Sequence, residues 1–231
     1  MTLALPDLCE KIVADAGVYV PQEDSWLLID TLQRTGVVEG RRVLDLCTGS
    51  GVIAVAAAQL GASEVTAFDI CPRAVRCSRT NATAAGVDVD VRKGSLSDAL
   101  ARGPFDVVLS NPPYVPVAPE VDTAVISPAA GPAWAWDAGD DGRLVLDPLC
   151  AAAPELLADG GSVVIVQSEF ADVEQTLTAL ARGGLDAEVI ASQWIPFGPV
   201  LSARANWLEA SGRLHTGRRE ELLAVIRADK R

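Results

Sequence analysis

Histidine is almost absent from this chain of 231 residues, which has one, His215, in a polar stretch near the C-terminus. A lone histidine in such a stretch is best interpreted as a surface residue. The five cysteines are scattered, and no two of them have a Cys-x-x-Cys spacing. No structural zinc site and no Ser-His-Asp triad can be assembled from these residues, so we expect no metal centre and no histidine base.

Positive charge is also scarce, because 19 Lys and Arg stand against 31 Asp and Glu, a formal net charge of −12. Residues 204–231 have seven Lys and Arg against four Asp and Glu, which is +3 and leaves −15 for residues 1–203. A protein that neutralises many phosphates needs the opposite balance. The charge therefore disfavours nucleic acid as the direct substrate and favours a small molecule or a protein, including a basic one.

Long apolar runs are missing, and no stretch approaches the length of a membrane span. Asp7 and Glu10 come early, and no basic segment precedes an apolar one, so we expect no signal peptide. These features predict a soluble, cytoplasmic protein that does not associate with membranes. The length suits one α/β domain with a sizeable core, so we predict a single domain over residues 1–231.

Apolar periodicity and turn residues predict strands that alternate with helices. The expected strands are Arg42–Cys47, Glu64–Ile70, Asp88–Arg92, Phe105–Leu109, Gly161–Gln167, Ala187–Trp194 and Leu222–Ala228. The expected helices are Pro6–Ala16, Glu23–Arg34, Val52–Leu60, Pro72–Ala85, Gly142–Ala158 and Ala171–Ala181. Residues 111–141 read as a long irregular segment, which in a compact domain is often functional.

This alternation predicts a doubly wound α/β fold with a mostly parallel, seven-stranded sheet that is covered on both faces. The last two strands have no clear helix between them, which predicts an antiparallel hairpin at one edge. Ligands in such sheets bind beyond the carboxyl ends of the strands.

The tetrapeptide Asn111-Pro112-Pro113-Tyr114 directly follows a predicted buried strand. Each proline fixes its own φ and restricts the residue before it, so Asn111 and the Pro112 carbonyl would be held in one geometry. A rigid, hydrogen-bond-accepting edge beside an aromatic ring suits a planar NH2 group that reacts at its nitrogen. Taken alone, the tetrapeptide is equally compatible with a proline turn at the end of a strand.

The turn after the first strand, residues 45–51, is rich in glycine. Gly49 and Gly51 allow a tight turn and close approach of a ligand, and the following helix N-terminus favours a carboxylate. Asp45 could accept from a ligand ammonium group, and Asp69, which ends the second strand, could accept from both hydroxyls of a ribose. Residues 49–54 also fit the loose fingerprint of nicotinamide enzymes. An aspartate near a pyrophosphate and the Asn-Pro-Pro-Tyr tetrapeptide both count against that alternative.

In this order and at these separations, the glycine turn, Asp69 and the tetrapeptide resemble class I S-adenosylmethionine-dependent methyltransferases, whose Asn-Pro-Pro-Tyr members methylate planar nitrogens. Residues 18–28 are similar to the segment before the cofactor strand in release-factor glutamine methyltransferases of the short, eukaryotic and archaeal type. Residues 136–142 resemble the Gly-Gly-x-Asp-Gly stretch of that family. The resemblance covers nearly the whole chain. It implies a Rossmann-like sheet, S-adenosylmethionine as cofactor, and a contribution of the N-terminal helical segment, residues 1–40, to the cofactor site.

The resemblance also implies a role for each matching residue. The catalytic set is Asn111 and Pro112, whose oxygens would accept the two N–H groups of the amide, and Tyr114, which would pack on the amide plane. The cofactor set is Ser25, Asp45, Cys47, Gly49 and Gly51 at the methionyl end, Asp69 at the ribose, Ser95 and Leu96 at the adenine, and Asn111 between cofactor and substrate. Cys47 stands where the family usually has glycine, and Ser95 replaces a frequent aspartate.

The leading functional hypothesis is N5-methylation of the glutamine in a Gly-Gly-Gln motif of a peptide-chain release factor. Some short-type relatives depend on a small zinc-binding activator protein, which is therefore a candidate partner. Adenine N6-methylation of RNA or DNA shares the tetrapeptide, but the acidic charge disfavours it. A cofactor-binding scaffold subunit with weak activity is a further alternative, because Cys47 and Ser95 depart from the family pattern.

Two further features leave alternatives open. Glu23 and Asp24 are equally compatible with charges that favour a helix N-terminus and with a role at the cofactor. Trp134 and Trp136 suit core packing by default, and in the long irregular segment they could also line a substrate groove.

Overall fold

The computed structural model describes residues 12–118, 126 and 131–231, and these form a seven-stranded sheet in the order β3-β2-β1-β4-β5-β7-β6. The strands are β1 (Arg42–Leu46), β2 (Glu64–Asp69), β3 (Asp90–Lys93), β4 (Phe105–Ser110), β5 (Leu157–Ser168), β6 (Asp186–Pro196) and β7 (Glu220–Asp229). Neighbouring strands are parallel, except that β7 runs antiparallel to both β5 and β6. The predicted fold class, a mostly parallel seven-stranded α/β sheet with antiparallel strands at one edge, is confirmed.

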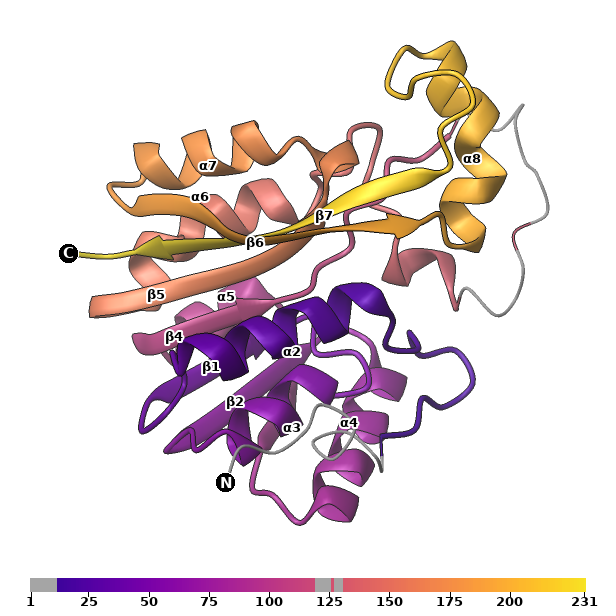
Figure 1. The fold of residues 1–231 in the computed structure, drawn as a ribbon. Coiled ribbons are helices and arrows are strands. Elements are labelled where there is room, and N and C mark those ends of the chain that lie inside the picture. Colours follow the sequence, from indigo (N-terminus) through magenta and orange to yellow (C-terminus); the bar gives the residue numbers. More distant parts are fainter. Residues whose placement is uncertain (1–11, 119–125, 127–130) are drawn as a thin grey trace.

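Helices cover both faces of the sheet (Figure 1). One layer holds α2 (Glu23–Thr35), α3 (Val52–Gln59) and α4 (Pro72–Ala85), and the other holds α5 (Leu96–Leu100), α6 (Leu146–Leu156) and α7 (Val173–Arg182). A further helix, α8 (Pro199–Ala210), connects β6 to β7 in the chain and lies beyond the sheet. The described residues also form two short 3-10 helices, η3 (Ala133–Ala135) and η4 (Glu169–Ala171). In the described part of the chain, no helix combines the length and the apolar character needed to cross a membrane.

Two apolar clusters fill the spaces between the sheet and its helical layers. Successive residues of β4 point to opposite faces, so Val107 and Leu109 pack under α2 and α3 while Val108 packs under α6. All three side chains are buried, which explains why the strand reads as a continuous apolar run rather than as an alternating one. A third, smaller cluster joins α8 to the segment after β4 through Val115, Trp136, Leu201, Ala205, Leu208 and Leu214.

Local sequence signals account for several helix boundaries. Helix α4 begins with Pro72 at its first turn and is followed by Gly86, which adopts a left-handed φ of 70°. Its bounds coincide with the predicted Pro72–Ala85. Helix α2 is followed in the same way by Gly36, with φ of 63°, and its last residue, Thr35, lies one position beyond the predicted end.

The predicted helix Pro6–Ala16 is wrong for its described part, and residues 6–11 lie outside the described residues. Residues 12–15 have no helical structure, and a turn follows in which the Val18 N–H donates to the Asp15 carbonyl over 2.9 Å. The amide of Asn81 binds both backbone groups of Val13, at 3.2 and 2.8 Å. These long-range bonds replace those that a helix would supply.

Strands β6 and β7 form the predicted antiparallel pair at the sheet edge, but the expectation that no helix lies between them is wrong, because α8 connects them. Pro199 at the first turn of α8 is a recognisable start signal that the prediction did not use. The helix expected over Gly142–Ala158 begins only at Leu146, because Gly142 is held at a φ of 79° that no helix contains. The short helix α5 was not expected.

Candidate active site

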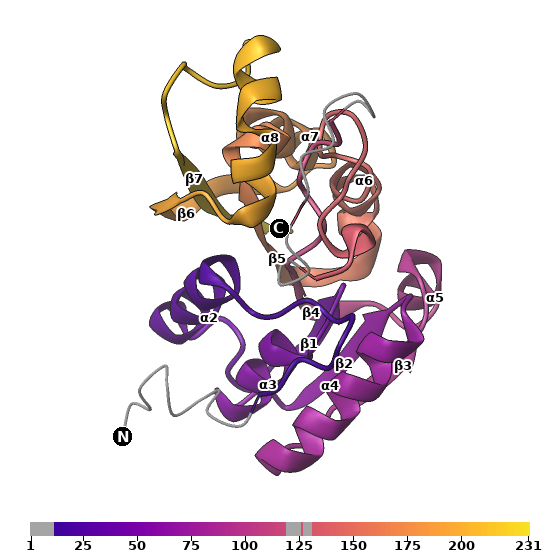
Figure 2. The same ribbon diagram turned by 90° about the vertical axis from the view of Figure 1, so that its right-hand side faces the viewer.

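A cavity of about 510 Å³ lies at the edge of the sheet where the parallel strands end, the edge that faces the viewer in Figure 2. Strand β7 runs the other way, so its first residues reach the same edge. The cavity is lined by residues 19, 21, 22, 24, 25, 46–50, 52, 53, 68–70, 94–96, 110–115, 134–137, 144, 145, 148, 149 and 198–201 and by Glu221. Of the predicted site residues, Asp45 and Gly51 lie behind this wall, and all the others line it.

The turn between β1 and α3 has an unusual backbone. Cys47, Gly49 and Gly51 have φ of 62°, 54° and 84°, all in the left-handed region. Glycine adopts this region freely, whereas a side chain such as that of Cys47 costs about 1–2 kcal/mol there. A Cβ on Gly51 would lie 3.0 Å from the Cα of Ser78. The turn therefore requires glycine at 51 for packing against α4 and carries strain at 47.

The thiol of Cys47 faces the cavity in a protonated form. Burial, together with the carboxylates of Asp69 and Asp45, raises the pKa of Cys47 to about 12. The thiol, rather than the more nucleophilic thiolate, is thus present at neutral pH.

Asp69 at the end of β2 holds the glycine turn in place. Its Oδ2 accepts from the Gly49 N–H over 2.9 Å, and its Oδ1 accepts from the Cys71 N–H over 2.8 Å. Burial raises the pKa of Asp69, and the two backbone N–H groups act against that rise. Each carboxylate oxygen still has a lone pair for a ligand hydroxyl at the cavity wall.

Asp45 lies beneath the turn rather than on the cavity wall. Its side chain is fully buried, Oδ2 accepts from the Thr48 hydroxyl over 2.6 Å, and Oδ1 has no partner among the described residues. Burial raises the pKa of Asp45 to about 7 despite that hydrogen bond. A direct contact of Asp45 with a ligand stays a prediction.

Ser95 and Leu96 line the cavity at the start of α5. The Ser95 N–H and hydroxyl both donate to Oδ2 of Asp98, over 2.8 and 2.9 Å. These bonds lower the pKa of Asp98. The Ser95 hydroxyl also lies 2.8 Å from the Ser97 hydroxyl, and either of the two could donate in that hydrogen bond.

The Asn-Pro-Pro-Tyr tetrapeptide leaves the end of β4 along the opposite side of the cavity. Asn111 donates through Nδ2 to the Ser25 hydroxyl oxygen over 3.2 Å, and Tyr114 donates through its hydroxyl to Asp24 over 2.9 Å. Burial and the carboxylate of Asp24 raise the pKa of Tyr114 well above 10. The structure thus joins the tetrapeptide to the first turn of α2, more than 80 positions earlier in the sequence.

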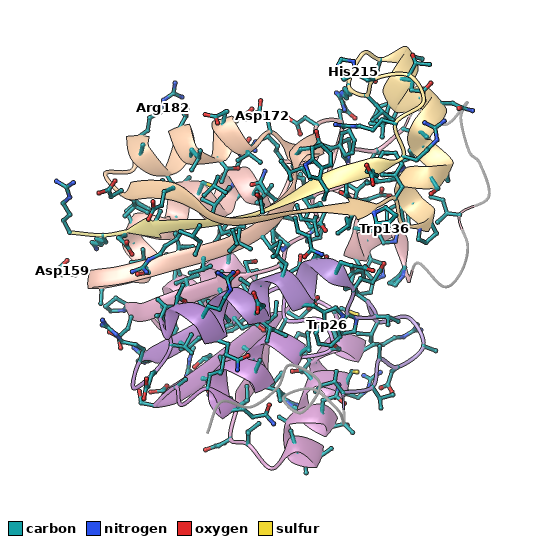
Figure 3. All side chains as sticks on the ribbon, in the orientation of Figure 1. Trp26, Trp136, Asp159, Asp172, Arg182 and His215 are labelled. Atoms are coloured by element: carbon teal, nitrogen blue, oxygen red, sulfur yellow. The ribbon has the colours of Figure 1, made fainter. Side chains whose placement is uncertain are left out.

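Helix α8 closes the wall beside the tetrapeptide. Arg204, which is 6% exposed, donates to the Pro116 carbonyl and to Asp137, each over 2.6 Å. Its guanidinium lies 4.8 Å from the centre of the Trp136 ring, and Figure 3 shows Trp136 beside α8. Trp134 and Trp136 both line the cavity, as the groove hypothesis requires. His215 is exposed in the loop after α8 (Figure 3) and does not line the cavity.

Glu221 is a cavity residue that the sequence did not reveal. It lies at the start of β7, is 6% exposed, and its Oε2 has no partner in the part of the chain that the structure describes. Burial and the nearby carboxylates of Asp24, Glu169 and Glu23 raise the pKa of Glu221 to about 7, and the Ser168 hydroxyl lowers it in part. A glutamate directly before the apolar run 222–226 is the signal that could have indicated it.

Replacing Glu221 by glutamine should change how stability depends on pH. The folded state binds the Glu221 proton more tightly than the unfolded chain does, so the wild type loses stability as pH rises from about 4.5 to about 7. The glutamine of the variant has no proton to lose. The free energy of unfolding of Glu221→Gln should therefore rise relative to that of the wild type by on the order of 3 kcal/mol between pH 5 and pH 8. Urea titrations at both pH values measure it, with exposed Glu220→Gln as control. Parallel curves for wild type and Glu221→Gln would refute the shifted titration.

Comparison with known proteins places these features in a family. Residues 10–129 match the family model described as Methyltransferase small domain. A protein of Methanocaldococcus jannaschii that carries the name protein N5-glutamine methyltransferase is 33% identical over 197 residues, which cover 84% of this chain and 94% of that protein.

A second relative is longer than this chain. The release factor glutamine methyltransferase of Deinococcus radiodurans is 40% identical over 183 residues, which cover 78% of this chain and 64% of that protein. The match thus spans less than two thirds of that relative. Among solved structures, the Mtq2 and Trm112 complex of E. cuniculi, described as responsible for methylation of the eRF1 translation termination factor, has a TM-score of 0.61 and 25% identity. That match covers 93% of this chain and 99% of the other.

Proposed function

Because the chain belongs to the S-adenosylmethionine-dependent methyltransferase family that the small-domain model describes, we propose that it methylates the side-chain amide of a glutamine, in the Gly-Gly-Gln motif of a peptide-chain release factor. One observation carries the proposal: the glycine turn after β1 and the tetrapeptide after β4 line the same cavity. A methyl donor at the first and an amide at the second would meet in one confined volume, and such positioning supplies much of the rate of a two-substrate reaction.

The cofactor end of the cavity fits S-adenosylmethionine. A Cβ on Gly49 would meet no side chain of the described residues within 4 Å, so the backbone there has room for a ligand. Asp69 offers its remaining lone pairs to ribose hydroxyls, and Ser95 and Leu96 line the part of the cavity that would hold the adenine. When bound, the cofactor supplies an electrophilic methyl group on a sulfonium.

The acceptor end fits a primary amide. Asn111 Oδ1 and the Pro112 carbonyl would each accept one N–H of the glutamine NH2 group, and Tyr114 would pack on its plane. An amide nitrogen is a poor nucleophile because its lone pair is delocalised. Two acceptors held on a rigid backbone favour pyramidal nitrogen and stabilise the positive charge that develops on it. The nitrogen becomes acidic only as the new N–C bond forms, so its proton can leave to solvent without a strong base.

The proposal treats residues 1–231 as one catalytic domain in which residues 1–40 help to form the site. Tyr19, Pro21, Gln22, Asp24 and Ser25 support this, because all five line the cavity. A small zinc-binding activator protein is part of the proposal. It is supported by the E. cuniculi structure, in which Mtq2 is in complex with Trm112. Turnover by the purified chain with and without such a partner measures the dependence.

A transfer assay tests the substrate. The chain is incubated with methyl-labelled S-adenosylmethionine and a release factor, either intact or with the glutamine of its Gly-Gly-Gln motif replaced by alanine. We expect label on the intact factor only. Label that persists on the replaced factor would refute the site of transfer. RNA and DNA serve as parallel acceptors, since preferential labelling of adenine would favour the nucleic-acid alternative. Tight cofactor binding without turnover on any acceptor would favour the scaffold alternative.

A further inference from the structure

Asp24 is the meeting point of four hydrogen bonds beside the acceptor tetrapeptide. It lies in the first turn of α2 and is 4% exposed. Its Oδ2 accepts from the hydroxyls of Tyr19 and Tyr114, each over 2.9 Å. Its Oδ1 accepts from the N–H of Ser25 over 2.6 Å and from the Ser25 hydroxyl over 3.2 Å. One buried carboxylate is therefore tied to α2, to the segment before it and to the tetrapeptide.

These hydrogen bonds determine which group donates in the hydrogen bond between Ser25 and Asn111. A carboxylate only accepts, so the single proton of the Ser25 hydroxyl is committed to Asp24. Toward Asn111 the Ser25 oxygen can then only accept, which requires the Nδ2 side of the amide to face it, as the 3.2 Å bond shows. With the amide turned over, Oδ1 would face the Ser25 oxygen with no proton between them. The Oδ1 atom of Asn111 is left without a donor from any described residue.

The helix-dipole explanation does not account for this arrangement. Glu23 lies in the same first turn and would benefit equally from the N-terminal dipole. Yet Glu23 lies off the cavity wall, whereas Asp24 is buried on it. Glu23 therefore serves as a matched control for Asp24, because it is a neighbouring carboxylate that does not line the cavity.

We propose that Asp24 is a positioning residue: through the Ser25 hydroxyl it sets the amide orientation of Asn111, and directly it fixes Tyr114. Asn111 Oδ1 is thereby presented as an acceptor before any substrate binds. The inference rests on the proposed glutamine methylation for its kinetic consequence, but the orientation itself is a property of the protein alone.

Kinetics of Asp24→Asn, Ser25→Ala and Glu23→Gln test the proposal. Misoriented acceptors lower the rate of transfer rather than cofactor affinity, so kcat should fall about 100-fold in Asp24→Asn. It should fall about tenfold in Ser25→Ala, which loses one hydrogen bond. The dissociation constant for S-adenosylmethionine should stay within about threefold in Asp24→Asn, whereas Ser25→Ala also removes a predicted cofactor contact, and Glu23→Gln should match the wild type. Because both variants break the same chain of bonds, the double variant should be no slower than Asp24→Asn within about threefold, instead of showing the product of the two losses.

Nuclear magnetic resonance of the Asn111 side-chain NH2 group tests the orientation without a substrate. Its resonances, identified by their loss in Asn111→Asp, should shift in Asp24→Asn and Ser25→Ala and stay in place in Glu23→Gln. Ser25→Ala removes only one small hydroxyl group, so the measurement can be made on this variant if Asp24→Asn does not fold. Unchanged Asn111 resonances, or losses that appear in cofactor affinity with kcat intact, would overturn the inference. A wild type that leaves the release factor unmethylated contradicts the proposed function instead, and the resonances then decide the inference alone.

Discussion

Replacing Asn111 by alanine is expected to lower the rate of methyl transfer at saturating substrates by about 100- to 1,000-fold, the range found when one pre-oriented hydrogen-bonding group is removed from an active site. Asn111 Oδ1 is the acceptor that would hold one amide N–H as charge develops on nitrogen. The backbone of the tetrapeptide and the glycine turn should stay in place, since among the described residues the Asn111 side chain hydrogen-bonds only to Ser25. Because Asn111 is also predicted to contact the cofactor, S-adenosylmethionine binding should survive in part, with a dissociation constant raised by no more than about tenfold.

The control for this prediction is Asn206→Ala, the same chemical change at an exposed position on α8. Single-turnover rates separate the chemical step from cofactor binding, which is measured by calorimetry. An Asn111→Ala protein with full activity would remove Asn111 from the catalytic set. A protein that loses cofactor affinity in proportion to activity would reassign Asn111 to the cofactor.

Replacing Gly142 by alanine should destabilise the protein and displace the tetrapeptide, because the new Cβ would press against the backbone of Tyr114. Gly142 has a φ of 79°, where alanine costs about 1–2 kcal/mol. A Cβ would collide with the carbonyl oxygen of Tyr114 and lie 3.2 Å from the carbonyl carbon. Overpacking of this kind costs a further 1–3 kcal/mol or so. The free energy of unfolding, measured in urea, should fall by about 2–5 kcal/mol in total, and the remaining folded enzyme should turn over more slowly.

Gly139→Ala isolates the contribution of the Tyr114 contact. Gly139 has a similar φ of 77°, but of the described residues its Cβ would meet only the Cβ of Leu144, at an ordinary 3.6 Å. It should cost about 1–2 kcal/mol and leave turnover intact. Equal losses in the two variants would show that the backbone conformation alone explains Gly142, and that its contact with Tyr114 has no part in the site.

The parts of the fold that the sequence predicted are those encoded by neighbouring residues. Buried strands such as β4 are short apolar runs between turn residues, and α4 has proline at its start and glycine after its end. Local motifs located the glycine turn, Asp69 and the tetrapeptide, the resemblance to a known family implied their roles, and the structure brings them to one cavity. Their individual roles stay predictions.

Apart from α8, whose start is marked locally by Pro199, several parts that the sequence did not predict depend on contacts between distant residues. Residues 12–16 carry helical periodicity, but Asn81 captures the backbone of Val13 from α4. Glu221 reaches the cavity because β7 runs against the other strands, which brings its first residues to their carboxyl edge. The importance of Asp24 over Glu23 follows from two tyrosine hydroxyls, one of them 90 positions away. No local pattern specifies such partners.

We expect this cavity to place a methyl group on a planar amide nitrogen. Tandem mass spectrometry of a release factor after incubation with the chain and S-adenosylmethionine tests this most directly. We expect one added methyl group on the side-chain nitrogen of the Gly-Gly-Gln glutamine, present with the wild type and nearly absent with Asn111→Ala. A methyl group on any other atom of the factor, or an unmodified factor beside methylated adenine in added RNA or DNA, would contradict it.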